Sequence, residues 1–209
     1  MKYRVNVMVV LTGICFTVPQ FAIAGEKHGH HDDFTVGVSG TGQLGLEFDF
    51  DDIIELPPAD GLITGWAADD PGFASLDMDE PKEDFFMLGS GAEISFEFIS
   101  GSPALSVWSP GFGSQVNQMG EQFIIGADEF DVHPTFHIDL NDPSYDPNLT
   151  DYSLSFRLVD GGSTNYANSE VYSVNFAAVP EPATLSLLVL GAGFCLRRNR
   201  ERNQSEGTA

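Results

Sequence analysis

Cysteine is scarce in this 209-residue chain, which has two, Cys15 and Cys195, one near each end. Each lies in an apolar run close to a terminus, so the long stretch between those runs contains no thiol. A disulfide framework, a cysteine zinc site and a cysteine nucleophile are therefore excluded for that stretch. Its stability must come from a hydrophobic core, with or without help from a bound metal, and 17 phenylalanines supply material for such a core.

Basic residues are the second shortage, with nine Lys and Arg against 31 Asp and Glu. Six of the nine lie near the two termini, which leaves Lys27, Lys82 and Arg157 in between. Against the 28 acidic residues outside the C-terminal segment, these three give the central part a formal net charge near −25. Such a field repels nucleic acid and attracts divalent cations. We therefore expect no nucleic-acid partner, and the acidity serves either solubility outside the cell or cation binding.

The N-terminus has the pattern of a secretory signal peptide. Lys2 and Arg4 precede an apolar run, Val5–Phe16. The tripeptide Ala22–Ala24 then forms an A-x-A cleavage pattern. We expect signal peptidase to cut after Ala24, so that the mature chain begins at Gly25.

The C-terminus carries a three-part segment. It consists of Pro180, Glu181 and Pro182, then the apolar run Ala183–Leu196, then Arg197 and Arg198. Each proline lacks a backbone donor and holds its predecessor extended, so a helix can begin only near Ala183. The run has 14 residues and would make a helix about 21 Å long. A helix that spans a bilayer needs ~20 residues, so this one is short for a full crossing. The pattern predicts a hydrophobic C-terminal helix that anchors the chain in a membrane, transiently or stably.

This segment resembles the PEP-CTERM sorting signal of bacteria that secrete exopolysaccharide. The matching stretch reads VPEPATLSLLVLGAGFCLRRNR, although nine further residues follow it where such tails usually stop sooner. The resemblance implies an exported protein of the cell envelope, outer surface or extracellular matrix, processed by the membrane enzyme exosortase. An ordinary single-pass anchor is the alternative, and it also places the preceding part outside the cytoplasm. The predicted organisation is a signal peptide (1–24), a His-rich polar arm (25–33), a body (34–178), a sorting segment (179–202) and a polar tail (203–209).

The body alternates apolar and polar residues with a period of two, and none of it shows a sustained helical period. Turns rich in Gly, Pro and Asp separate the alternating stretches, and the acidic stretch Asp69–Glu83 reads as a long surface loop. The pattern predicts an all-β fold, an antiparallel sandwich of the jelly-roll type. The expected strands are Phe34–Ser39, Leu44–Phe50, Leu62–Trp66, Asp84–Leu88, Glu93–Phe98, Ala104–Trp108, Gln122–Gly126, Phe130–Leu140, Tyr152–Leu158 and Tyr172–Phe176.

One expected strand, Phe130–Leu140, carries candidate metal ligands. Alternation would put Asp131, His133 and His137 on one face. Imidazole suits zinc, and a carboxylate can orient its second nitrogen. Along a regular strand the two histidines lie ~13 Å apart, so a shared ion needs a bend at Pro134, or each histidine needs partners from another strand. Polar residues facing solvent are the alternative.

His28, His30 and His31 form a second candidate, on the polar arm. Such a cluster binds borderline metals weakly without a preformed site. A solvated tail is the alternative. The Asp- and Asn-rich stretch 139–148 resembles a calcium loop only in composition, so calcium is the less favoured metal.

The sequence offers little for catalysis. It has no G-x-S-x-G elbow and no H-E-x-x-H motif. The spacing G-x-G-x-x-G occurs at Gly40–Gly45, but a strand pattern follows where a nucleotide site needs a helix. We expect a protein that is not an enzyme.

Parts of the body also resemble exported, PEP-CTERM-tailed proteins of cyanobacteria that a zinc regulator represses. The matching pieces include GWAADDPGFASL at Gly65–Leu76, LSVW at Leu105–Trp108 and the H-x-x-x-H spacing at His133–His137. This resemblance implies a surface protein linked to zinc supply, with histidines as ligands. However, Ile138 and Asp139 follow His137 where such proteins often have an aromatic residue.

Three functions remain open from the sequence. The first is a structural or binding role at the cell surface, and the second is zinc binding through the histidines. The third is polysaccharide binding, with Trp66 or Trp108 stacking on sugar rings.

Overall fold

The computed structural model describes residues 33–59 and 63–179. The signal peptide, most of the polar arm and nearly all of the sorting segment lie outside these ranges. Among the described residues, the regular elements are strands and one 3₁₀ turn, η2 (Pro110–Phe112), and turns and loops connect them. The strands are β1 (Phe34–Val38), β2 (Leu44–Glu47), β3 (Ile53–Leu56), β4 (Gly65–Ala68), β5 (Phe73–Ser75), β6 (Ile94–Gly101), β7 (Leu105–Trp108), β8 (Gln115–Val116), β9 (Gln122–Gly126), β10 (Asp131–Val132), β11 (Thr135–Asp139), β12 (Asp151–Asp160) and β13 (Tyr172–Ala178).

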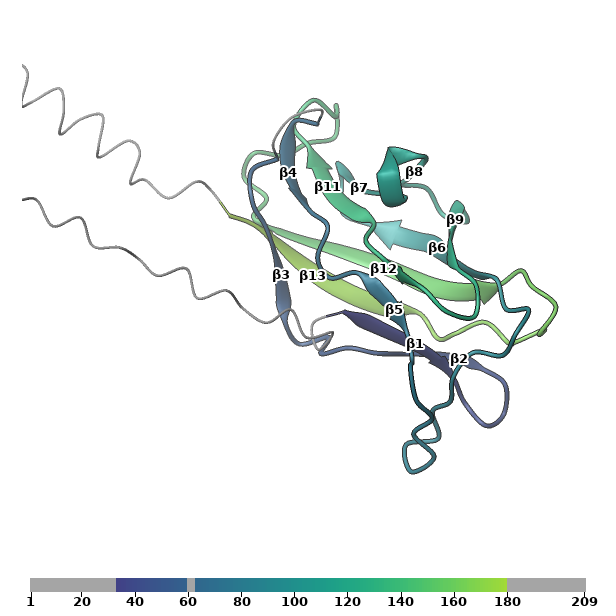
Figure 1. Ribbon diagram of the computed structural model, residues 1–209. Helices are drawn as coiled ribbons and strands as arrows, with labels where there is room; N and C mark the ends of the chain where they lie inside the picture. The colour runs from purple at the N-terminus through teal and green to yellow at the C-terminus, as the bar shows by residue number, and fades with distance from the viewer. Residues whose placement is uncertain (1–32, 60–62, 180–209) are drawn as a thin grey trace, which may run out of the picture.

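The strands form three sheets. Their orders are β10-β5-β1-β2, β4-β11-β7-β8 and β3-β13-β12-β6-β9. Strand pairs are antiparallel except for two, β1 with β5 and β3 with β13, which are parallel. In Figure 1, β12 and β13 run side by side through the middle of the molecule, with β1, β2 and β5 on one side and β4, β7 and β11 on the other. The prediction of an all-β, mainly antiparallel fold is confirmed.

Phenylalanines join the three sheets into one core. On β12, the residues that alternation assigned to the inner face are all buried. Phe156 of this strand lies 5.6 Å, centroid to centroid, from Phe34 of β1. Phe136 of β11 lies 5.0 Å from Phe176 of β13 and 6.5 Å from Phe34. The two four-stranded sheets therefore cover the same face of the five-stranded sheet, as the layers of a sandwich do.

The strand prediction is wrong for Asp69–Glu83 and for Asp84–Leu88, and also for Phe130–Leu140, which is described with the candidate site. The stretch Asp69–Glu83 contains β5, whose Phe73 is fully buried. The stretch has few apolar residues, but Phe73, Ala74 and Leu76 are buried in the core, while its acidic residues lie at the surface. Conversely, Asp84–Leu88 forms no strand and contributes isolated bridges, among them Val38 with Phe86. Strands β3 and β8 were not expected; each has four residues or fewer.

The sheet β10-β5-β1-β2 brings three loop positions to one end. Phe73 of β5 pairs with Phe34 of β1 in parallel and with Val132 of β10 in antiparallel register. The residues before β1, the residues before β5 and the residues after β10 therefore meet at the same end of neighbouring strands. Asp33, the loop that contains Asp70, and His133 occupy these positions.

Candidate metal centre

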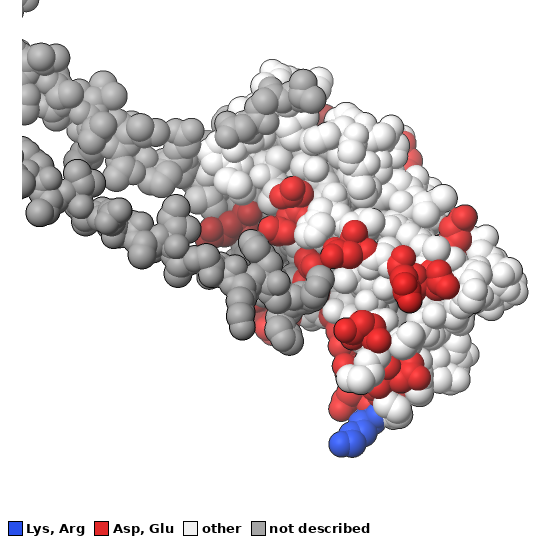
Figure 2. Space-filling model, viewed as in Figure 1, with Lys and Arg blue, Asp and Glu red and all other residues white. Residues whose placement is uncertain are grey.

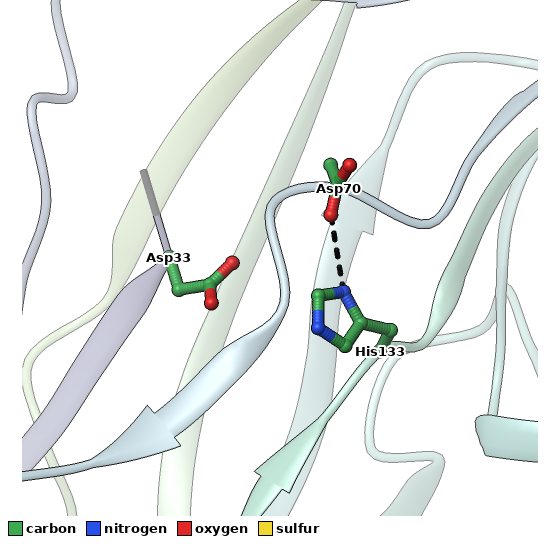
Figure 3. Close-up of side chains that lie close together, drawn as sticks. All are labelled: Asp33, Asp70 and His133. Atoms are coloured by element: carbon green, nitrogen blue, oxygen red, sulfur yellow. Dashed lines mark ion pairs between the residues drawn. The ribbon is translucent and has the colours of Figure 1, made fainter. Parts of the chain in front are cut away.

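Asp33, Asp70 and His133 form a compact cluster at this end of the sheet. Each offers one ligand atom, and these atoms all lie within 4.8 Å of one another. Figure 3 shows the carboxylate of Asp33 and that of Asp70 directed toward the imidazole ring from two different segments. A third segment carries His133, so residues 37 and 63 positions apart in sequence come together only in the folded chain.

Backbone contacts fix two sides of the cluster. The Gly72 amide donates a hydrogen bond to Oδ1 of Asp33 at 2.7 Å. The Phe34 amide in turn donates to the Gly72 carbonyl at 3.0 Å, which continues the β1–β5 pairing up to the site. A Cβ on Gly72 would lie 2.7 Å from Cε1 of His133, so only glycine allows the loop to pass this close to the ring.

The two ring nitrogens of His133 have different surroundings. Nδ1 lies 2.9 Å from the Asp69 carbonyl and 3.1 Å from Oδ1 of Asp70. Since a carbonyl oxygen only accepts, Nδ1 carries a proton. Nε2 lies 3.5 Å from Oδ1 of Asp131. In the neutral ring without metal, the lone pair is therefore on Nε2. An ion held between Asp70 and His133 would take the place of the Nδ1 proton, and Nε2 would then carry a proton on the side of Asp131.

The cluster attracts positive charge. Burial lowers the pKa of His133, but the Asp69 carbonyl and the three surrounding carboxylates outweigh burial, so this pKa lies above the ordinary value of histidine. The side chains stay accessible, since His133 is 40% exposed and Asp70 is 70% exposed. Figure 2 shows further acidic groups gathered over the part of this face where β1, β2 and β5 lie in Figure 1. Cations thus meet an open and strongly negative surface.

The donor set fits a divalent transition metal. Two ligands on opposite sides of one ion, each with a ~2 Å bond, lie at most about 4 Å apart. The separations of up to 4.8 Å therefore need inward movements of less than about 1 Å. An imidazole nitrogen favours zinc over calcium, which prefers oxygen ligands only. The carboxylates alone would not make this distinction.

His137, the second histidine expected in this site, lies elsewhere. The expected single strand Phe130–Leu140 is wrong, because the chain breaks at His133 and Pro134 into β10 and β11, which belong to different sheets. Proline has no amide proton for a ladder hydrogen bond, so pairing stops there. His133 and His137 therefore do not come together, and the predicted exposed row of polar side chains is divided.

His137 is 3% exposed and both of its ring nitrogens have protein partners. Nε2 lies 3.0 Å from the Thr64 carbonyl, and the Trp108 indole donates to Nδ1 at 3.4 Å. The proton is therefore on Nε2, and the lone pair of Nδ1 accepts from Trp108. This arrangement suits a histidine that joins β11 to its neighbours.

The other expected ligands divide into two groups. Asp131 is close to His133, as predicted, and is 52% exposed. His28, His30 and His31 lie outside the described residues. Sequence reasoning missed Asp33 and Asp70 as members of the cluster, since it assigned one to the polar arm and the other to a turn. The repeated Asp-Asp before β1 and before β5 was the available signal, but only the β1–β5 pairing joins the two.

Neither tryptophan is a freely exposed platform. Trp66 and Trp108 are both partly buried. Trp66 packs 6.0 Å from Tyr145, and Trp108 packs 5.8 Å from Phe112, centroid to centroid. Both aromatic pairs cover the sheet that contains β11.

A match to known proteins lies at the C-terminus. A family model described as the PEP-CTERM protein-sorting motif matches residues 178–200. No curated protein and no solved structure matches the chain. Within residues 33–59 and 63–179, the structure contains no helix of the length and apolarity that a membrane crossing requires. The motif implies export, processing by exosortase and envelope-associated sorting. This chain therefore carries a PEP-CTERM protein-sorting motif at residues 178–200.

Proposed function

We propose that the exported body is a non-enzymatic binding module of the cell surface that holds one divalent transition-metal ion, zinc by preference. Asp33, Asp70 and His133 are the ligands, with Asp131 beside them. The main observation behind this function is the convergence of three sequence-distant ligand atoms within 4.8 Å.

Two further features support the proposal. The central part of the chain has no cysteine, so a metal is the remaining means of cross-linking its segments. The cluster joins the start of β1, the loop before β5 and the end of β10. A bound ion would join these three segments and stabilise this end of the sheet. The site would thus either stabilise the fold of a surface protein or hold zinc outside the cell.

Calorimetric titration of the exported chain with zinc tests this function. We expect one zinc per body, with affinity reduced at least about tenfold in His133→Ala and in Asp33→Asn. Glu83→Gln is the matched control, because it removes one exposed acidic charge outside the cluster. Unchanged affinity in His133→Ala, or an equal loss in Glu83→Gln, would reject the site and leave only non-specific attraction to acidic groups.

A polar pocket favours a second candidate function, saccharide binding. It lies on the sheet that contains β7 and β8, and its lining includes Ser102, Ser106, Gln115, Asn117 and Asp142. Hydroxyl, amide and carboxylate groups of this kind form hydrogen bonds with sugar hydroxyls. Binding on a glycan array that is lost in Asn117→Ala would support this function, and its absence would remove it.

A further inference from the structure

Two rows of side chains mark out the surface of the five-stranded sheet that points away from the core. On β12 the even-numbered residues from 152 to 158 are buried, so the odd-numbered residues point outward. The first row crosses β3, β13 and β12 and consists of Ile53, Asn175 and Ser153. The second row crosses β12, β6 and β9 and consists of Val159, Ser95 and Ile124. We call the outward positions of these five strands, from the first row to the second, the outer face.

The outer face is electrically neutral. On the described strands that form it, the charged side chains between the two rows are Arg157 and Glu97, and they form an ion pair with an Nε–Oε2 distance of 2.6 Å. The central part of the chain as a whole has a formal net charge near −25. Acidic residues flank the face, for example Asp52 before β3 and Asp151 at the start of β12. A centre depleted in charge inside a polar rim is the composition of a protein–protein interface.

The side chains of the outer face can be removed from water at low cost. Ile53 and Ile124 are each 57% exposed, so their burial would be favourable. The hydroxyl oxygens of Ser155 and Ser173 lie 2.9 Å apart and are hydrogen-bonded to each other. A polar group that has a partner within the protein costs less to bury than one without a partner. The outer face therefore suits a contact from which water is excluded.

The outer face is also large enough for a stable dimer. Neighbouring strands lie about 4.8 Å apart, so five strands are about 24 Å wide. Positions 153 to 159 span about 20 Å along β12, and the side chains at both ends extend this length to about 25 Å. Two such faces in contact bury about 1,200 Å² together, which exceeds the ~1,000 Å² that a specific interface needs.

We propose that the exported body forms a dimer in which the outer faces of two copies pack against each other. Bodies with a charge near −25 repel one another, and the neutral face is where two of them meet with the least repulsion. Ile53 and Ile124 lie on the two edge strands, at opposite corners of the face. A two-fold axis that runs between these corners places Ile53 of each copy on the partner's Ile124. The metal cluster belongs to a sheet that covers the opposite face, so this dimer is independent of the proposed metal-binding function.

Sedimentation velocity of the exported chain in EDTA, over a range of protein concentrations, tests this inference. We expect the wild type to dimerise in the micromolar range, and Ile53→Glu and Ile124→Glu each to raise the dissociation constant about tenfold or more. Leu140→Glu is the matched control, because it adds the same charge at an exposed aliphatic residue outside the outer face, and it should dimerise as the wild type does. Added salt should lower the dissociation constant of the wild type, because it screens the repulsion between the acidic rims.

A wild type that stays monomeric into the millimolar range would overturn the inference. The same holds for a dimer that Leu140→Glu weakens as strongly as Ile124→Glu does, since the effect would then come from charge alone and not from the outer face. A dimer that forms only when zinc is added would place the contact on the acidic surface and would also overturn it. Ser173→Glu replaces either isoleucine variant if that variant does not fold.

Discussion

Arg157 of β12 and Glu97 of β6 lie opposite each other in the five-stranded sheet and form a two-point ion pair. Nε of Arg157 lies 2.6 Å from Oε2 of Glu97, and its Nη2 lies 3.1 Å from Oε1. The Glu97 side chain is 9% exposed, whereas that of Arg157 is 36% exposed. Arg157 and Lys82 are the two basic residues among those the structure describes. One of them is thus used to neutralise a nearly buried carboxylate.

Arg157→Ala should lower the free energy of unfolding by about 1–3 kcal/mol, because it leaves the Glu97 carboxylate without its charged partner. Urea denaturation measures this loss. The double variant Arg157→Ala/Glu97→Gln should recover part of it, since no buried charge then remains. An Arg157→Ala variant as stable as the wild type would show that the pair contributes nothing.

His137→Ala should destabilise the body by about 2–4 kcal/mol, because it opens a cavity and leaves the Thr64 carbonyl and the Trp108 indole without a partner. Tryptophan fluorescence during urea unfolding measures this change, since Trp108 contacts His137. Folded His137→Ala should keep the zinc affinity of the wild type. His133→Ala should do the reverse, with a small change in stability and a large loss of zinc binding. Loss of zinc binding in folded His137→Ala would contradict the assignment of His137 to the structure.

Asp160 should contribute stability that depends on pH. Its Oδ1 accepts from the amides of Glu93 and Gly162, and its Oδ2 accepts from the Thr164 hydroxyl and the Tyr166 amide. Burial raises the pKa of Asp160, but these hydrogen bonds outweigh burial and lower it below the ordinary value. A lowered folded-state pKa gives stability that is present above the unfolded-state pKa and is lost as pH falls through the folded-state pKa.

Asp160→Asn should therefore lose about 1–3 kcal/mol at pH 7, where the charged carboxylate accepts all four bonds. The difference from the wild type should shrink when the pH falls below the ordinary range of aspartate. Urea denaturation at pH 7 and at pH 3 provides the comparison. A difference that stays constant over this range would show that the charge of Asp160 is not involved.

Alternation alone predicts much of the sandwich. The inner residues of β12 follow it from Tyr152 to Leu158, and β9 has the expected bounds, Gln122–Gly126. The three residues of β5 are too few for a period to show, and they lie in an acidic stretch. Their strand conformation depends on pairing with β1, which no local pattern contains.

The same limit applies to the site. Asp131 and His133 could be found from the sequence because they lie two positions apart. Asp33 and Asp70 join them through the β10-β5-β1 order of the sheet. His137 has the same residue type as His133, and its burial depends on partners from neighbouring segments, Thr64 and Trp108, which no local pattern contains.

Substitution of Pro180, Glu181 and Pro182 by alanine should prevent processing by exosortase, because it removes the Pro-Glu-Pro part of the sorting motif. The mass of the exported chain measures this. We expect the wild type to lose its C-terminal tail and the triple variant to keep the tail, with its four arginines, and to remain with the membrane. Gln204→Ala, in the polar tail, should be processed normally. Equal masses for the wild type and the triple variant would contradict the prediction.

Anomalous diffraction at the zinc edge, from crystals of the exported chain grown with one equivalent of zinc, tests the central claim most directly. The account predicts one strong peak within about 2.0–2.2 Å of a ring nitrogen of His133 and of carboxylate oxygens of Asp33 and Asp70. A well-ordered crystal with no peak at these residues, or with its zinc bound elsewhere on the acidic surface, would contradict it.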